Sequence, residues 1–307
     1  MPAARRSQFA DARAKVTPMS ASSSRTARLR TLLREPGLRL MPCAFDALSA
    51  RLIEAAGFPL SFMSGFGVSA ARLGLPDTGL ISYAEMLDQG RSICAATSIP
   101  IIGDGDTGYG NPLNVKRTVR GYAQAGFAGV MIEDQLAPKR CGHTAGKQVV
   151  SRAEALARVR AAVDARDEGA DILIVARTDA RHTHGFSEAL ARIEAFSELG
   201  ADVVFLEAPV DRDEMRTFCA ATKTPALANM LEGGHTPLLP PGELEQLGYK
   251  IAAYPLTLLN AALVAMQRVL AEIQTGAPAS GLMPFAELRK VVGFDAYDQE
   301  ADRYRDG

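Results

Sequence analysis

Short apolar runs alternate with amphipathic segments along the chain from Gly37 onward. Eight runs, among them PIIGDGD, GVMIED and DVVFLEAP, are apolar on consecutive residues, and most are separated by segments with the apolar spacing of a helix. Several of those segments end in glycine, as helices often do. Strands that are apolar on successive residues are typical of parallel sheets buried on both faces. The expected strands span residues 38–45, 61–65, 100–106, 129–134, 171–179, 202–209, 225–230 and 249–256.

Eight strand–helix units in about 250 residues predict an α/β protein of the (β/α)8 TIM-barrel type. A doubly wound open sheet is the alternative, because a strand count alone does not prove closure. The polar residues favour the barrel, since the carboxyl ends of all barrel strands meet at one mouth, where active sites are built. Polar residues lie at or just past seven of these strand ends: Asp46, Ser64, Asp104, Asp106, Glu133, Asp134, Arg177, Asp179, Glu207 and Asn229.

The run IIGDGDTGYGN can be interpreted as a dinucleotide-binding loop or as a metal site. Its glycines spell G-x-G-x-x-G, but that motif belongs after the first strand of a βαβ unit, and here it follows the third expected strand. Asp104 and Asp106 would also repel a pyrophosphate. In an extended segment residues two apart point to the same side, so both carboxylates can face one cation, and Mg²⁺ suits such ligands. The remaining alternative is that these acids cap the next helix or stabilise a turn.

The stretch PKRCGHTAGK, residues 138–147, follows the fourth expected strand and is too polar to be core. Lys139, Arg140 and His143 surround Cys141 with positive charge, which favours a reactive thiolate. The alternative is a solvated loop that His143 merely orients. Cys43 is expected to fill the barrel interior, and Cys94 and Cys219 to be packing residues.

Composition narrows the function classes. The chain has 307 residues, of which 47% are hydrophobic, and a net charge of −1, which provides no bulk charge for nucleic acid or an anionic membrane. No apolar run approaches the ~20 residues that a membrane helix needs. The four cysteines form no C-x-x-C pair and follow no secretory signal, so a reducing compartment is expected.

The first 35 residues differ from the rest of the chain. Residues 1–30 are rich in Arg, Ser and Ala and contain a single acid, Asp11. This composition is typical of a disordered tail or of an organellar transit peptide. We therefore expect a tail or targeting segment over residues 1–35 and a barrel with a C-terminal helical extension over residues 36–307. A cytoplasmic protein is expected, with organellar targeting by the tail as the alternative.

The motifs GDGDTGYGN, IEDQ, PKRCGH, VARTDA, LEAP and NMLEGG, in this order, resemble the isocitrate lyase/phosphoenolpyruvate mutase superfamily. The KRCGH loop is similar to its lyase branch, which includes 2-methylisocitrate lyase, 2,3-dimethylmalate lyase and the petal death protein. Sequences named carboxyvinyl-carboxyphosphonate phosphorylmutase are also similar. The resemblance covers roughly residues 35–300. It implies a barrel whose C-terminal helix is swapped between subunits and a homotetramer, a dimer of helix-swapped dimers.

The resemblance also implies roles for individual residues. Asp104 and Asp106 would hold Mg²⁺, with Mn²⁺ as a substitute and Glu133 in the outer shell; Asp77 matches a position near the metal. The resemblance assigns the other site residues to two groups, one that binds the substrate and one that is catalytic. The substrate would be bound by Ser64, Gly65, Phe66, Gly142, Arg177, Glu207 and Asn229, and the catalytic side chains would be Cys141, Lys139, His143 and Arg177, with Lys139, Cys141, Gly142 and His143 on a mobile gate.

The implied reaction is cleavage of a 2-hydroxy dicarboxylate to a 2-oxo acid and a carboxylate, with Cys141 as general acid. One departure concerns Phe62, which stands where methylisocitrate lyases carry tyrosine and cannot accept the hydroxyl proton. It favours 2-substituted malates over 2-methylisocitrate, and oxaloacetate is a further candidate. A phosphonomutase on the same scaffold is the alternative function, and a non-catalytic barrel is a distant third.

Overall fold

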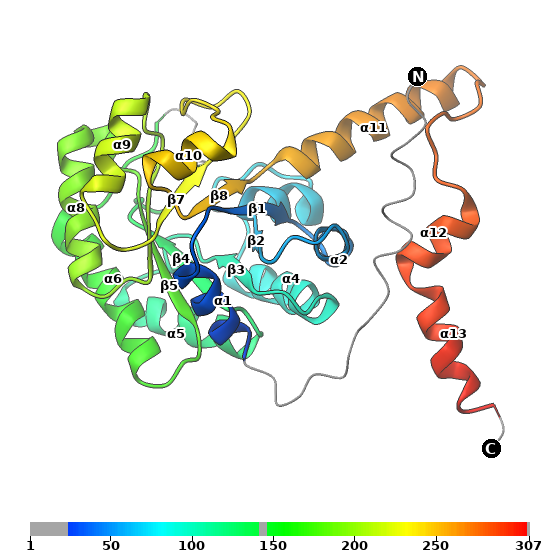
Figure 1. Ribbon diagram of the computed structural model, residues 1–307, viewed down its shortest axis with the longest axis horizontal. Helices are drawn as coiled ribbons and strands as arrows, with labels where there is room; N and C mark the ends of the chain where they lie inside the picture. The colour runs from blue at the N-terminus through cyan, green and yellow to red at the C-terminus, as the bar shows by residue number, and fades with distance from the viewer. Residues whose placement is uncertain (1–23, 141–145, 306–307) are drawn as a thin grey trace. The chain divides into compact units, whose positions relative to one another are not determined.

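The computed structural model of the protein describes residues 24–140 and 146–305. The described residues form a closed barrel of eight parallel strands in which each strand pairs with the next and β8 pairs with β1 (Figure 1). This confirms the predicted (β/α)8 barrel and rules out the open sheet. The strands are β1 (Arg39–Ala44), β2 (Ser61–Met63), β3 (Ile101–Asp104), β4 (Gly129–Glu133), β5 (Leu173–Thr178), β6 (Val203–Leu206), β7 (Ala226–Asn229) and β8 (Ile251–Tyr254).

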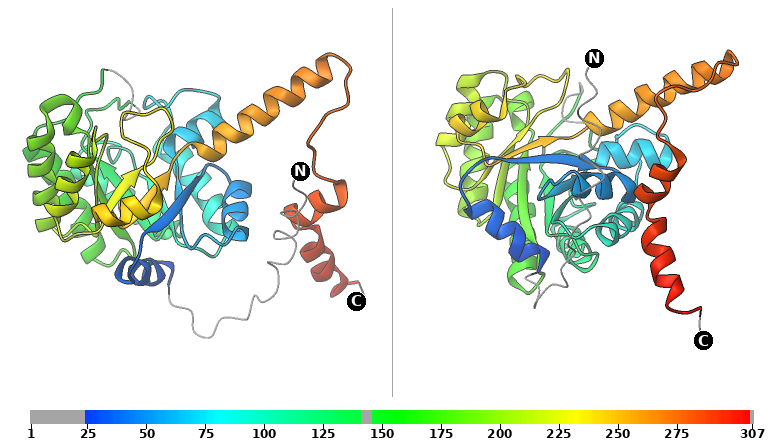
Figure 2. Two further views of the ribbon diagram at one scale, coloured as in Figure 1. Left: turned by 45° about the horizontal axis from the view of Figure 1, so that its top comes forward. Right: turned by 45° about the vertical axis from the view of Figure 1, so that its right-hand side comes forward.

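Helices follow the strands and cover the outside of the barrel (Figure 2). Side-chain caps define where several of them begin. Ser82 and Glu85 form a capping box at the start of α4, and Asn111 and Asn114 form one at the start of α5. The helices between β1 and β8 are α2 (Ala47–Ala55), α3 (Gly65–Val68), the π-helix η1 (Ser69–Leu73), α4 (Tyr83–Ala96), α5 (Pro112–Gln124), α6 (Arg152–Asp167), α7 (Ala180–His184), α8 (Phe186–Glu198), α9 (Arg212–Ala220) and α10 (Pro241–Leu247).

Strand residues alternate between two apolar layers. Ile101 packs in the layer between the strands and the helices, whereas Ile102 packs inside the barrel. The interior layer includes Phe62, Phe205 and Cys43, as expected for Cys43. The barrel is therefore filled by side chains, and a ligand site is confined to its rim.

Helix α1 (Arg25–Arg34) differs from the sequence-based expectation, which placed residues 1–35 in a tail. Leu29 is fully buried in the same cluster as Leu60 and Ile251, at the amino ends of the strands. Thr26 donates a hydrogen bond to the Asp171 carbonyl (2.8 Å) and Arg25 donates one to the Cys94 carbonyl (2.8 Å). Its arginines thus bind backbone carbonyls of the barrel, and residues 1–23 lie outside the described part of the chain.

A second compact unit begins at Leu259 and contains most of α11 (Thr257–Gln274), α12 (Phe285–Val292) and α13 (Phe294–Asp302). This is the helical extension expected at the C-terminus. Many of its apolar side chains are exposed in the single chain, among them Leu270 and Phe285. The expected exchange of a helix between subunits stays a prediction. Within the described ranges, every helix is too short or too polar to cross a membrane.

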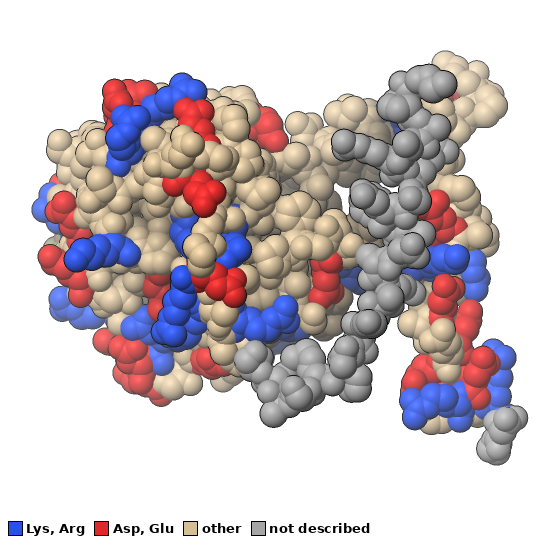
Figure 3. Space-filling model, viewed as in Figure 1, with Lys and Arg blue, Asp and Glu red and all other residues tan. Residues whose placement is uncertain are grey.

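The surface carries both signs of charge. On the barrel face drawn in Figure 3, lysines and arginines lie interspersed with aspartates and glutamates. Many charged side chains of the described residues are paired, as in Arg181 with Glu214 (2.9 Å) and Arg166 with Asp202 (2.8 Å). This mixed surface agrees with the near-zero net charge.

Candidate active site at the barrel mouth

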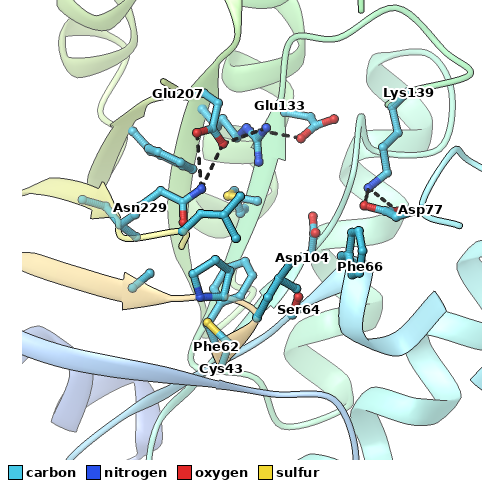
Figure 4. Close-up of a pocket in the computed structure, with 18 of the residues that line it drawn as sticks. Cys43, Phe62, Ser64, Phe66, Asp77, Asp104, Glu133, Lys139, Glu207 and Asn229 are labelled. Carbon is cyan, nitrogen blue, oxygen red and sulfur yellow. Dashed lines mark hydrogen bonds and ion pairs between the residues drawn. The ribbon is translucent and has the colours of Figure 1, made fainter. Parts of the chain in front are cut away.

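A pocket lies at the carboxyl ends of the strands and brings together side chains from most of them (Figure 4). Its empty space amounts to about 660 Å³, a volume that includes open solvent at its mouth. One side is charged and the other is apolar. Its lining includes the predicted site residues Ser64, Phe66, Asp104, Glu133, Lys139, Arg177, Glu207 and Asn229, together with Asp77 and Arg140.

Asp104 ends β3 and is held against the backbone. Its Oδ1 accepts a hydrogen bond from the Asp106 amide (3.1 Å), and its Oδ2 accepts one from the Gly65 amide (3.2 Å). A Cβ at position 65 would lie 2.4 Å from Asp104 Oδ2, so only glycine allows this approach. The turn contact considered as an alternative for Asp104 is therefore present. It also fixes the carboxylate at the pocket wall beside Ser64, which caps α3 by accepting from the Gly67 amide (3.1 Å).

The glycines of the G-x-G-x-x-G run serve packing. A Cβ at Gly103 would lie 2.7 Å from the Tyr122 ring, and one at Gly105 would lie 2.6 Å from the Met131 carbonyl oxygen. Tyr122 in turn donates a hydrogen bond to the Asp104 carbonyl (2.7 Å). The close packing accounts for the first two glycines without a pyrophosphate.

Lys139 lies among the acids on the charged side. Its Nζ is 2.6 Å and 2.7 Å from the two carboxylate oxygens of Asp77 and 2.8 Å from Asp106 Oδ1. Burial lowers the pKa of Lys139, but Asp106, Asp104 and Asp77 outweigh it and hold that pKa well above its usual value. Burial raises the pKa of Asp106 to about 6, with Lys139 opposing the shift and Asp104 adding to it. Lys139 is therefore an ammonium ion that several carboxylates share.

The carboxylate side chains of the site could hold a hard metal cation through a small number of direct ligands. The Glu133 Oε1 atom is buried without a hydrogen-bond partner, and burial raises the pKa of Glu133 well above its usual range. Over the described ranges, no three acidic, histidine or cysteine side chains lie close enough to bind one ion together. Such a site suits an ion that uses one or two carboxylates and completes its shell with water and substrate oxygens, as Mg²⁺ does.

Arg177 connects the remaining polar residues. Its Nε and Nη2 donate to the two carboxylate oxygens of Asp179 (2.8 and 3.1 Å), and Nη2 also lies 3.0 Å from Glu207 Oε2. The Asn229 Nδ2 donates to Glu207 Oε1 at 3.3 Å, as Figure 4 shows. The guanidinium lies 5.2 Å from the centre of the Phe205 ring. These contacts fix both Arg177 and Asn229 at the pocket wall.

Two lysines of the loop are buried, which differs from the solvated-loop alternative. The side chains of Lys139 and Lys147 are 5% and 1% exposed, whereas Arg140 is exposed. Lys147 Nζ donates to Asp179 Oδ1 (2.9 Å), the carboxylate that also binds Arg177. The loop residues predicted to be catalytic or substrate-binding, Cys141, Gly142 and His143, lie outside the described residues.

Apart from Phe62 and Phe66, sequence reasoning did not identify the apolar wall of the pocket as part of a site. Met131, Phe205 and Leu227 are inward-facing strand residues, so their sequence signal is the same as that of barrel filling. Leu231 follows β7 just beyond Asn229, the polar residue that ends that strand, and this proximity is the available signal; Leu256 follows β8. The wall is completed by Cys43, Phe62 and Ala253.

The other cysteines and two strand-end acids have structural roles. Burial raises the pKa of Cys94 and Cys219 to about 12 and that of Cys43 still further, so these thiols are un-ionised, as expected for packing residues. Asp46 caps α2 by accepting from the Ser49 amide (2.7 Å). Asp134 accepts from Thr178 Oγ1 (2.6 Å) and from Arg192 (2.9 Å) behind the site.

Comparison with known proteins places this barrel among related enzymes. The phosphoenolpyruvate phosphomutase family matches residues 29–274. The chain is 41% identical to 2,3-dimethylmalate lyase of Eubacterium barkeri, over 92% of this chain and 98% of that protein. It is 43% identical to the chloroplastic carboxyvinyl-carboxyphosphonate phosphorylmutase of Arabidopsis thaliana, over 91% of this chain and 86% of that protein.

Solved structures give the same placement. Oxaloacetate acetylhydrolase in complex with the inhibitor 3,3-difluorooxalacetate matches with a TM-score of 0.88 and 36% identity, covering 92% of this chain and 98% of that chain. Phosphonopyruvate hydrolase in complex with oxalate and Mg²⁺ matches with a TM-score of 0.82 and 28% identity, covering 92% and 99%. The relatives confirm the expected superfamily and the expectation of an enzyme of the carbon–carbon lyase type. The chain therefore belongs to the phosphoenolpyruvate phosphomutase family, in the superfamily that also contains isocitrate lyase.

Proposed function

We propose that the protein is a Mg²⁺-dependent lyase that cleaves 2-hydroxy dicarboxylates to a 2-oxo acid and a carboxylate. The observation that carries the proposal is the pocket, with Asp104 in its lining and Asp106 paired to the lining residue Lys139 on one side, and Arg177, Asn229 and an apolar wall on the other. The preferred substrates are 2-substituted malates, whose small alkyl groups match that wall. Oxaloacetate and 2-methylisocitrate are further candidates. The names 2,3-dimethylmalate lyase and oxaloacetate acetylhydrolase among the relatives support this choice.

Asp104 and Asp106 are the proposed metal ligands, with Glu133 in the outer shell and Mn²⁺ as a substitute for Mg²⁺. When bound, the ion supplies positive charge to the 2-hydroxyl and its neighbouring carboxylate. Support comes from the buried, unpartnered Glu133 Oε1 and from the solved relative that contains oxalate and Mg²⁺. The proposed assembly is a homotetramer of helix-swapped dimers, which the exposed apolar side chains of the C-terminal unit support.

The chain's own residues bind the two ends of the substrate. Ser64, Gly65 and Phe66, in the first turn of α3, are proposed to bind the carboxylate next to the hydroxyl carbon. Arg177 and Asn229 are proposed to bind the second carboxylate, in positions fixed by Glu207. Held at both ends, the carbon–carbon bond between the two carboxylate-bearing carbons is fixed for cleavage.

Cleavage requires one proton to leave and one to arrive. The hydroxyl loses its proton as the carbonyl forms, and the electron pair of the broken carbon–carbon bond stays on the carbon next to the second carboxylate. Arg177, with Lys139 and His143 of the loop, is proposed to stabilise that negative charge, and the Cys141 thiol to protonate the carbon. Phe62 has no acid–base group, so the hydroxyl proton leaves to another acceptor.

Replacing Cys141 by alanine is expected to lower the rate of cleavage by about 10²–10⁴-fold, because the carbanion loses its proton donor. Binding of Mg²⁺ and of a 2-oxo acid should stay close to that of the wild type, since the thiol contributes to neither. Single-turnover kinetics and product titration measure the two properties. Cys94→Ala, which removes a buried packing thiol, is the matched control. Unchanged turnover in Cys141→Ala would remove the thiol from the mechanism.

The affinity for Mg²⁺ is expected to fall as the pH is lowered. The pKa of Asp106 is raised to about 6, so the folded protein binds a proton there that an ordinary aspartate would already have released. Because a metal needs the ionised carboxylate, the apparent affinity should weaken about tenfold from about pH 7 to about pH 5. Calorimetric titration at several pH values measures this, and an affinity independent of pH in that interval would contradict the ligand role of Asp106.

A phosphonomutase is the second candidate, and the 43% identity to a relative named as a phosphorylmutase favours it. The presence of Cys141 argues for the lyase, because phosphoryl transfer has no carbanion to protonate. The functional test is release of a 2-oxo acid from 2-alkylmalates, 2-methylisocitrate and isocitrate, and of oxalate from hydrated oxaloacetate, with Mg²⁺ and again with a chelator. Mg²⁺-dependent release supports the lyase; turnover of phosphonates alone supports the mutase.

A further inference from the structure

The Lys139 ammonium is bound to one of the two proposed metal ligands. Its Nζ lies 2.8 Å from Asp106 Oδ1, and the side chains of Lys139 and Asp106 are each 5% exposed. At this distance and burial the two groups form a close ion pair that water screens little. One of the two oxygens with which Asp106 could bind a metal ion is thus already in contact with a cation that belongs to the protein.

Lys139 and a divalent ion exclude each other at Asp106. Two cations that approach the same carboxylate oxygen repel each other, and the repulsion is strong in a buried site where water screens little. The lysine has a four-carbon stem and can move away without any change in the barrel strands. It also has a second partner, because both oxygens of Asp77 lie within 2.7 Å of its Nζ. The ammonium can therefore leave Asp106 and remain paired.

We propose that Lys139 is a built-in counter-ion of the metal site: it neutralises Asp106 when no metal is bound, and Mg²⁺ must displace it from Asp106 to bind. The inference rests on the proposed metal site and goes beyond it, since it makes Lys139 the residue that limits the affinity for the cation. Displacement leaves the ammonium on Asp77, still within the lining of the pocket.

Neutral variants of Lys139 test the proposal. Lys139→Met and Lys139→Gln remove the charge without and with a hydrogen-bond donor, and Lys139→Arg keeps it. Calorimetric titration with MgCl2 at about pH 8 should give a dissociation constant at least about tenfold lower in the neutral variants than in the wild type. Lys139→Arg should stay within about threefold of the wild type, because a cation still competes.

Lys147→Met is the matched control. Lys147 is buried to a similar degree and also pairs with an aspartate, but its partner is Asp179 and not a proposed metal ligand. The Mg²⁺ affinity of the Lys147→Met variant should equal that of the wild type. A second readout is the rise in melting temperature on adding Mg²⁺, which should be larger in Lys139→Gln than in the wild type, because tighter binding stabilises the folded state more.

The outcomes separate the two proposals. If the wild type binds no Mg²⁺, the metal site itself is wrong and the counter-ion role falls with it. If the wild type binds Mg²⁺ and the folded neutral variants bind it no more tightly, the metal site stands and the counter-ion role is overturned.

Discussion

Gly65→Ala is expected to lower kcat/KM by about 100-fold or more, although the change adds only one methyl group. The new Cβ would lie 2.4 Å from Asp104 Oδ2, which now accepts a hydrogen bond from the Gly65 amide. Asp104 would have to move, and displacements of about 1 Å in an active site cost about 10² in rate. The same shift should weaken Mg²⁺ binding, whereas the free energy of unfolding should fall by only about 1–3 kcal/mol, as for other overpacked sites.

Gly242→Ala is the matched control for this effect. Gly242 also has no left-handed backbone angle, but a Cβ there would meet nothing within 4 Å. It lies in the first turn of α10, where alanine should leave catalysis unchanged and stabilise the fold by about 0.4–1 kcal/mol. Steady-state kinetics and urea unfolding of both variants measure the difference. Equal activity of the two variants would mean that the position of Asp104 does not matter for turnover.

Arg177→Lys is expected to lower kcat/KM by about 10²–10³-fold, because lysine keeps the charge but loses the planar fork. The guanidinium now binds both oxygens of Asp179 and one oxygen of Glu207, and an ammonium cannot reproduce these directions together. The folded state should persist, since a cation still faces the buried acids. Arg177→Met, which removes a buried cation from beside Asp179 and Glu207, should cost about 3–5 kcal/mol of stability.

Arg166→Lys provides the comparison for Arg177. Arg166 also makes several polar contacts, to the Gly200 carbonyl and to Asp202, but it lies outside the pocket lining. The kcat/KM of the Arg166→Lys variant should equal that of the wild type. The two conservative variants, assayed side by side, separate the loss of a catalytic fork from the general effect of replacing arginine. Full activity of Arg177→Lys would contradict its role at the second carboxylate.

The barrel could be predicted from the sequence because parallel strands have a simple signature. Each strand is apolar on consecutive residues, and the polar residue that ends it, such as Asp104 or Glu207, marks the rim. Helix α1 gave a weaker signal. Leu29, Leu32 and Leu33 have helical spacing, but the arginines around them resemble a tail. The structure shows the role of two of these arginines: Arg25 and Arg28 donate hydrogen bonds to backbone carbonyls near the amino ends of the strands.

The sequence predicted which charged residues belong to the site, but it did not predict which of them form ion pairs with one another. The spacing of Asp104 and Asp106 indicated a shared cation, yet nothing in the sequence places Lys139 against Asp77, which is 62 residues away. The apolar half could not be predicted, because Phe205 and Leu227 face inward like any barrel residue. Contacts between distant segments decide which inward residues line a cavity and which fill the core.

The central claim is Mg²⁺-dependent cleavage of a carbon–carbon bond, and NMR spectroscopy of the reaction tests it most directly. The full-length protein is incubated with a 2-alkylmalate in D2O, with Mg²⁺ and with a chelator. We predict equal amounts of a 2-oxo acid and a carboxylate that carries deuterium next to its carboxyl group, and both should form only with Mg²⁺. Intact 2-alkylmalates, together with rearrangement of a phosphonate under the same conditions, would contradict the account.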